Sequence, residues 1–132
     1  MYVRFVTPLR DPATGAETGF FRAAWYLDEV GCPEWIDQEL EAQFDWFNAN
    51  LAIPETIRGG VCWFRPEACE CIERARYCAW LINESGVPVE TIRLRRPGSV
   101  LWRDDHQLVV RPDAATPRAF AGRAYPGRFQ VN

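Results

Sequence analysis

The only histidine of the chain, His106, directly follows Asp104 and Asp105 in the stretch VLWRDDHQLVV, residues 100–110. These residue types suit a metal site, an acid–base pair or a tight turn between two strands. Adjacent strand residues point to opposite faces, which argues against a contiguous metal site. An acid–base pair needs a nucleophile, and no serine or cysteine motif supplies one. We therefore favour a turn whose aspartate carboxylate caps backbone N–H groups. A functional His106 is the alternative, because histidine titrates near neutral pH.

Four cysteines have the spacing C-x6-C-x-C-x6-C, which raises the question of zinc: Cys62, Cys69, Cys71 and Cys78. Structural zinc sites usually pair ligands roughly two to four residues apart and then repeat the pair. Cys69 and Cys71 would lie about 200° apart around a helix, so they cannot face one ion. We predict that the cysteines pack as small hydrophobic residues, and we predict neither a metal nor a cofactor. A reactive thiol at Cys62 or Cys69 is the alternative.

The segment between Arg22 and Arg58 has no basic residue but eight acidic ones. Within it, Pro33 suits the first position of a helix, and apolar residues repeat with helical spacing on one stripe: Ile36, Leu40, Phe44, Phe47 and Leu51. A second stripe, about 100° away, carries Trp35 and Trp46 beside a row of carboxylates. Either a larger core covers both tryptophans, or they are exposed and bind a partner.

Exposed tryptophans beside acidic residues are typical of a protein-binding surface that attracts a basic partner. We expect this surface to consist of Trp35, Glu39, Glu41, Asp45 and Trp46. The C-terminal near-repeat RAFAG and RAYPG adds Arg118 and Arg123, which we expect to assist. Arginines interleaved with aromatic residues also predict weak binding of nucleic acid at most. An acidic, aromatic surface can occupy a basic or nucleic-acid-binding surface of another protein, which would make this protein inhibitory.

The pattern of the whole chain predicts an α+β fold: a single domain with a mostly antiparallel sheet of about four to five strands and two to three helices packed on one face. Residues 1–112 should form the globular part, and residues 113–132 a loosely ordered tail rich in Arg, Pro and Gly. The predicted strands are residues 2–6, 61–64, 87–95 and a hairpin over 99–111. The predicted helices are residues 20–30, a long helix from 33 and a helix from 66 to about 83.

Composition excludes several classes of protein. The 132 residues are 48% hydrophobic and 25% charged, with a net charge of −3, which is typical of one globular domain. All 15 basic residues are arginine. No apolar run is long enough to span a bilayer, and the N-terminus lacks the features of a secretory signal. We therefore expect a cytoplasmic protein, in which an odd number of cysteines does not indicate a disulfide scaffold.

Residues 100–110, with Asp104 and Gln107, are similar to the closing strands of ADP-ribosyltransferase-like proteins. An arginine on the first strand, Arg4, and an aromatic strand at 61–64 followed by a helix are compatible with that layout. The chain has Gly98 and Ser99 where the catalytic glutamate of that family is expected.

Two functions are therefore predicted. The first is an interaction protein that binds through the acidic, tryptophan-bearing helix. The alternative, which the resemblance implies, is a small transferase or other enzyme with a pocket near Arg4, Trp63 and His106. Its catalytic residues would be Arg4, His106 and Gln107.

Overall fold

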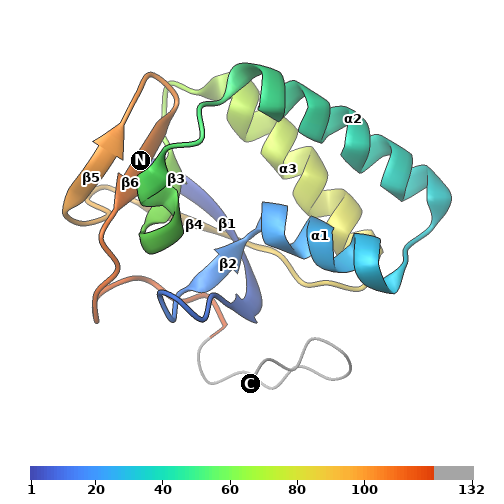
Figure 1. The fold of residues 1–132 in the computed structure, drawn as a ribbon, viewed down its shortest axis with the longest axis horizontal. Helices are drawn as coiled ribbons and strands as arrows, with labels where there is room; N and C mark the ends of the chain where they lie inside the picture. Colours follow the sequence, from blue (N-terminus) through green and yellow to red (C-terminus); the bar gives the residue numbers. More distant parts are fainter. Residues whose placement is uncertain (121–132) are drawn as a thin grey trace.

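A computed structural model describes residues 1–120 of the chain (Figure 1). Its strands are β1 (Tyr2–Arg10), β2 (Glu17–Gly19), β3 (Val61–Phe64), β4 (Glu90–Leu94), β5 (Val100–Arg103) and β6 (Gln107–Val110). Its helices are α1 (Phe20–Val30), α2 (Glu34–Asn50) and α3 (Cys69–Glu84), with a short 3-10 helix, η1 (Glu55–Gly59). Among residues 1–120, no helix is both long and apolar enough to span a membrane.

The six strands form one antiparallel sheet that is organised around β1. Along one edge, β1 pairs with β4 from Tyr2↔Leu94 to Val6↔Glu90. Along the other edge, β1 pairs first with β3 at Val3↔Phe64 and then with β2 at Val6↔Gly19. Strands β6 and β5 continue outward from β3. The edge of β1 is thus divided between two partners, so the sheet splits beside Arg4 and Phe5.

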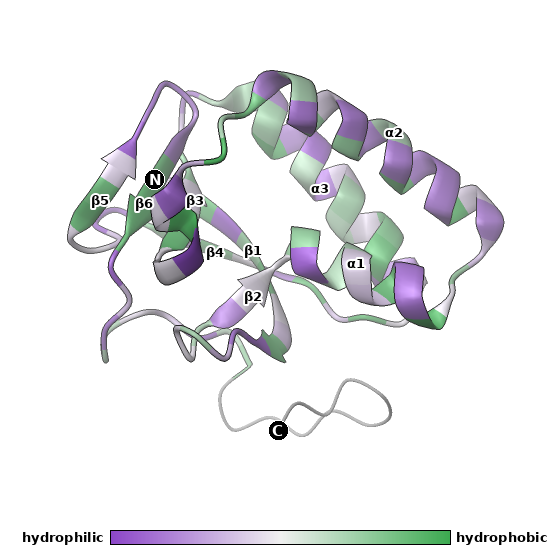
Figure 2. Ribbon diagram, viewed as in Figure 1, coloured by the Kyte–Doolittle hydropathy of each residue, from purple (hydrophilic) through white to green (hydrophobic). Residues whose placement is uncertain are grey.

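The three helices gather on one side of the strands (Figure 1) and share a core with β1. In α2, Ile36, Leu40 and Phe47 are buried, and their spacing places them on one helical face. The buried face of α3 consists largely of small residues, so this helix packs closely: Cys71, Ala75, Cys78 and Ala79. The rest of α2 is mostly hydrophilic (Figure 2).

A second, smaller cluster lies where β3 and β6 pair. Its buried members are Ala16, Val61, Trp63, Leu108 and Val110. The alternation of a strand explains this division, since Val61 and Trp63 share one face of β3 whereas Phe64 packs in the helical core. The split in the sheet therefore lies between two separately packed regions.

The predicted fold class is confirmed, as are the helix at 20–30 and the hairpin at 99–111. Several local features differ from the prediction. Strand β1 continues to Arg10, four residues beyond the strand predicted at 2–6. Strand β2 was not predicted, because three residues carry no measurable alternation. Helix α3 begins at Cys69, since a turn closed by Ala68 N–H and the Arg65 carbonyl precedes it. Strand β4 begins only at Glu90, because Val87 N–H donates to the carbonyl of Ile82 and completes the end of α3.

Candidate functional site

A pocket of about 720 Å³ lies at the split in the sheet. Residues from β1, β2, β3 and β6 line it together with residues from α1, the end of α2 and η1. Eight of the lining residues are aromatic: Phe5, Phe20, Phe21, Trp25, Phe44, Phe47, Trp63 and Phe64. A pocket of this size and apolar character is typical of a small-molecule site.

Arg4 supplies a buried positive charge to this pocket. The residue is only 7% exposed. Its Nη2 donates to the main-chain carbonyl of Glu17, but Nη1 has no hydrogen-bond partner. Burial lowers the pKa of the guanidinium to about 10, against the smaller raising effects of Cys62, Glu17 and Asp11. The ion pairs among residues 1–120 are Arg65–Glu67 and Arg74–Glu70, so the charge of Arg4 has no carboxylate in contact.

A second buried donor on the same pocket wall also lacks a partner. Trp63 is 1% exposed, and its indole Nε1–H makes no hydrogen bond. Within the described residues, Arg4 Nη1 and Trp63 Nε1 are the buried side-chain N and O atoms without a partner. Both atoms are donors, and buried donors without acceptors are costly. Two residues that line the pocket therefore each carry an unused buried donor, and no buried side-chain acceptor among residues 1–120 is left unused.

The carboxylate of Glu17 lies nearby but is already occupied. Glu17 is 2% exposed, and its two carboxylate oxygens accept the backbone N–H groups of Ala119 and Phe120 at 2.6 and 2.7 Å. Two charge-assisted hydrogen bonds satisfy this anion within the chain. Glu17 thus meets Arg4 through its main-chain oxygen and holds the segment at 119–120 through its side chain.

Cys62 and Gln107 form a fixed hydrogen-bond chain at the pocket wall. The Cys62 thiol donates to Gln107 Oε1 at 3.3 Å, and Gln107 Nε2 donates to the carbonyl of Ala52 at 2.9 Å. Both ends of the amide are therefore used. Burial raises the pKa of the Cys62 thiol to about 12, although Arg4 lowers it in part. The thiol is protonated at neutral pH and is a poor nucleophile.

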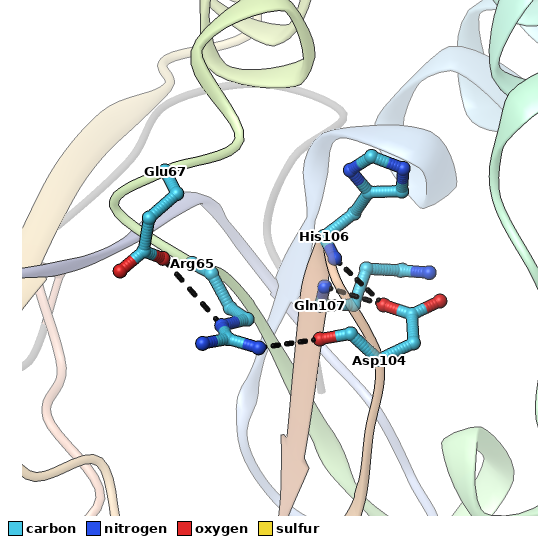
Figure 3. Close-up of polar contacts among 5 residues, drawn as sticks. All are labelled: Arg65, Glu67, Asp104, His106 and Gln107. Atoms are coloured by element: carbon cyan, nitrogen blue, oxygen red, sulfur yellow. Dashed lines mark hydrogen bonds and ion pairs between the residues drawn. The ribbon is translucent and has the colours of Figure 1, made fainter.

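His106 lies in the β5–β6 turn (Figure 3). It is not one of the residues that line the pocket. Asp104 Oδ1 accepts the backbone N–H groups of His106 and Gln107 at 2.9 and 2.8 Å, so this carboxylate caps the turn as predicted. The turn spans residues 104–106, and none of them has a positive φ. Arg65 braces it by donating to the carbonyl of Asp104 at 2.9 Å. Of the predicted enzymatic residues, Arg4, Trp63 and Gln107 share the pocket, whereas His106 is separate.

The residues predicted to bind a partner lie apart from this pocket and differ in exposure. Trp35 is 50% exposed, and Glu39, Glu41 and Asp45 are exposed or partly exposed on α2. Trp46 is only partly exposed, because it packs against the helical core and carries Arg74 over its ring at 4.3 Å. The two tryptophans therefore do not form one open stripe.

The structure describes one of the two tail arginines that were predicted to assist binding. Arg118 is exposed, with Nη2 at 3.5 Å from the carbonyl of Gly15. Arg123 lies outside the described residues.

The cysteines of α3 point to different surroundings. Cys69 is exposed, whereas Cys71 and Cys78 are buried in the helical core. Burial raises the pKa of the Cys78 thiol to about 12. In the described part of the chain, no group of three His, Cys, Asp or Glu residues is arranged to hold a metal ion.

Two features of the site were not predicted from the sequence. Glu17 was missed because a single acid in the stretch AETG has no pattern that indicates burial. Two arginines that line the pocket, Arg22 and Arg58, were also missed, since they come from α1 and η1 and meet only in the fold. Only their isolation on either side of the acidic segment marked them.

No protein-family model, curated protein or solved structure matches this chain. The resemblance of residues 100–110 to ADP-ribosyltransferase-like proteins therefore stays a prediction.

Proposed function

We propose that the protein binds a small molecule in which a carboxylate or phosphate is joined to a flat apolar body. The observation that carries the proposal is the unpaired Nη1 of Arg4, a residue that lines the pocket. A buried cation with no carboxylate in contact is costly to the folded protein, and an anionic ligand would reduce that cost. A guanidinium is well suited to this role because its planar donors match carboxylate and phosphate oxygens.

The indole of Trp63 supports the same ligand chemistry. Its unused N–H is a donor, so an oxygen acceptor satisfies it as well as Arg4. The exposed arginines Arg22 and Arg58 also line the pocket and add positive potential. The acids in the lining are Asp11 and Glu17, and the carboxylate of Glu17 is already hydrogen-bonded. An anion is therefore favoured over a cation.

The aromatic lining supports a flat apolar body for the ligand. Phe21 and Trp25 of α1 line the pocket yet are 40% and 72% exposed. Phe21 belongs to a group of rings that continues into the core, with centroids 4.2 Å from Phe20 and 5.3 Å from Phe44. A ring-shaped ligand would extend this group and remove apolar surface from water.

The site favours binding over group transfer. Gln107 has no free amide atom, the Cys62 thiol is held protonated, and His106 does not line the pocket. None of these three residues is placed to act as a general base on a bound ligand. We therefore propose a binding protein whose recognition centre is Arg4.

Calorimetric titration with naphthoate and with the neutral naphthamide tests the proposal. These probes share one ring system, so their difference isolates the charge. We expect naphthoate to bind at least about tenfold more tightly, because the anion pairs with a buried cation. Equal affinity for the two probes would contradict the proposal. A failure to bind naphthoate, naphthamide and phenyl phosphate would contradict it as well.

Variants of Arg4 assign the binding to this residue. In Arg4→Met, the preference for naphthoate should disappear, whereas Arg4→Lys should keep part of it because the charge remains. Arg103→Met is the matched control, since Arg103 is an exposed arginine on β5 that does not line the pocket. Thermal unfolding of each variant verifies that it is folded. A naphthoate preference that survives in Arg4→Met would place the anion site elsewhere.

A further inference from the structure

An exposed aromatic surface lies where α2 meets α3, on residues that do not line the pocket. It consists of Trp35 from α2 with Tyr77 and Trp80 from α3; these three residues are called the aromatic surface below. The ring centroids of Trp35 and Trp80 are 6.2 Å apart, and those of Tyr77 and Trp80 are 6.0 Å apart. Trp35 and Trp80 are 50% and 49% exposed. Two helices thus combine to present large rings to solvent.

Core packing does not explain why these rings are in place. The neighbours of Trp35 and Trp80 along the chain, Ile36 and Ala79, are buried in the core, so the inner faces of both helices are already filled by other residues. Tyr77 is instead oriented by the exposed carboxylate of Glu39, which accepts its hydroxyl at 2.7 Å. This bond holds the phenol ring in place beside Trp80. Clustered, oriented aromatic side chains on a surface are typical of binding sites.

The charges around the aromatic surface have one predominant sign. Helix α2 carries no basic residue and five acids that reach solvent: Glu34, Asp37, Glu39, Glu41 and Asp45. None of the ion pairs among residues 1–120 involves these five carboxylates. On α3, Arg76 is an exposed basic residue one turn before Trp80, and Glu84 is an exposed acid one turn after it. Helix α2 therefore brings unneutralised negative charge to the aromatic surface, and Glu39 is the carboxylate in direct contact with it.

We propose that the aromatic surface binds an arginine- or lysine-bearing segment of a protein partner. A guanidinium or ammonium group is attracted both by the face of an indole ring and by the carboxylates of α2. A contact of this kind already occurs within the chain, where the guanidinium of Arg74 lies over the ring of Trp46 at 4.3 Å. The proposal is independent of the pocket, since neither Arg4 nor Trp63 takes part.

Titration with a synthetic Gly-Arg repeat peptide tests this inference, and a peptide with citrulline in place of arginine is its neutral counterpart. We expect the arginine peptide to bind at least about tenfold more tightly, because citrulline has the same shape without the charge. NMR signals of the Trp35 and Trp80 indoles should shift on binding. Equal affinity for the two peptides, or shifts confined to other residues, would overturn the inference.

Variants separate the contributions of rings and charge. Trp80→Ala and Trp35→Ala should each weaken binding about 5- to 20-fold, and Glu39→Gln about threefold. The matched controls are Trp102→Ala on β5 and Glu55→Gln on η1, which should leave affinity unchanged. Because Trp35 and Trp80 are exposed and lie on different helices, at least one variant should remain folded, as thermal unfolding would verify. Unchanged affinity in both tryptophan variants would overturn the inference.

Sedimentation of the protein alone examines a different occupant of the aromatic surface. The inference expects a monomer at concentrations where the peptide binds. Self-association that is lost in Trp80→Ala would mean that a second copy of the chain covers the rings, and it would overturn the proposal of a basic partner.

Discussion

Arg4 combines a cost in stability with a gain in recognition. Its guanidinium is buried, its pKa is lowered by that burial, and it contacts a main-chain oxygen without any carboxylate. Residues that hold a functional charge out of water commonly reduce the stability of the fold. We therefore expect the Arg4 side chain to strengthen ligand binding while it lowers the free energy of unfolding.

The replacement Arg4→Met should raise the free energy of unfolding by about 1–3 kcal/mol, because an aliphatic side chain is buried without the penalty of a charge. The gain is limited by loss of the hydrogen bond to the carbonyl of Glu17. Urea denaturation at neutral pH measures it, with Arg103→Met as a control that should change little. A less stable Arg4→Met protein would mean that the guanidinium is needed for packing.

Cys78 should make stability depend on pH above neutrality. Its thiol is buried, and its pKa is raised from an ordinary 9.0 to about 12. Below pH 9 the thiol is protonated in both states and contributes no slope. Above pH 9 the unfolded chain loses this proton first, so stability falls with rising pH until about pH 12. One unit above the unfolded pKa, the loss is about 1.4 kcal/mol for this thiol.

Urea denaturation at pH 8 and pH 10 would measure this effect. Cys78→Ala should lose about 1.4 kcal/mol less than the wild type between the two values, because the variant lacks the thiol. Cys69→Ala is the control, since Cys69 is exposed and its removal should leave the pH dependence unchanged. An identical slope in the wild type and Cys78→Ala would contradict the argument.

At the scale of residues, the sequence was sufficient where the cause is local. The cap formed by Asp104 was predictable, because a carboxylate reaches N–H groups two and three residues onward. The isolation of Arg4 was not, because it depends on which carboxylates fail to reach it in the fold. The difference in exposure between Trp35 and Trp46 likewise could not be predicted, because it depends on Arg74, which comes from another helix.

At the scale of elements, the position of β3 beside β6 and η1 depends on Gly60, which directly precedes the strand. A Cβ on Gly60 would meet the side chain of Val109 on β6 and lie 2.8 Å from the Thr56 carbonyl of η1. No such contact exists at Gly59, where a Cβ would meet nothing within 4 Å. The close approach of three elements at one point therefore leaves no room for a side chain at residue 60 unless a neighbouring atom moves.

The replacement Gly60→Ala should reduce the free energy of unfolding by about 1–3 kcal/mol, because the methyl group forces β3 away from β6. Gly59→Ala is the matched control and should be nearly neutral. Thermal and urea denaturation compare the two. Equal stability of both variants would show that β3 and β6 accommodate the methyl group by a small shift.

The β5–β6 hairpin should depend on one of its two aspartates. Asp104→Ala removes the acceptor of two backbone N–H groups and should cost about 1–2 kcal/mol. The neighbouring Asp105→Ala should have little effect, because Asp105 is exposed and makes no such cap. Urea denaturation of both variants tests this difference, and Asp104→Asn should retain most of the stability. A larger loss in Asp105→Ala would contradict the cap.

The helices were predictable from periodicity, and the sheet only in part. The spacing of Ile36, Leu40 and Phe47 along the chain is enough to indicate the buried face of α2. Strand β2 escapes prediction because its three residues are too few to show an alternation and are defined only by their pairing with β1. The start of β4 is displaced for a similar reason, since residues 87–89 are used to finish α3.

For the molecule as a whole, the fold class follows from the number and order of elements, but the split in the sheet does not. The split exists because β3 and β2 share one edge of β1, and the pair of β3 with β1 joins residues far apart in the chain. The pocket lies at that split, so its residues could be named singly from the sequence but not assembled. Arg4, Trp63 and Gln107 were candidates, whereas Glu17, Arg22 and Arg58 were not.

The segment at 119–120 should contribute to the stability of the whole domain. A chain ending at residue 112 lacks the two backbone N–H groups that donate to the Glu17 carboxylate. Its free energy of unfolding should be about 2–4 kcal/mol lower than that of a chain ending at residue 120. Urea denaturation compares the two chains. Glu17→Gln in the shorter chain should recover part of the loss, because a neutral amide is less costly to bury without donors. Equal stability of both chains would contradict this role.

The bonds from Glu17 to Ala119 and Phe120 join residues 102 and 103 positions apart, so they close nearly the whole described chain into a ring without a covalent link. Under a pulling force, these two hydrogen bonds would hold the two ends of the ring together. A machine that threads the protein from its C-terminal side would pull on this carboxylate before it reached β6 or α3. The load would pass through β2 to β1, the strand with three partners. Resistance to threading should therefore depend on one buried glutamate, and its release would expose the strand around which the sheet is built.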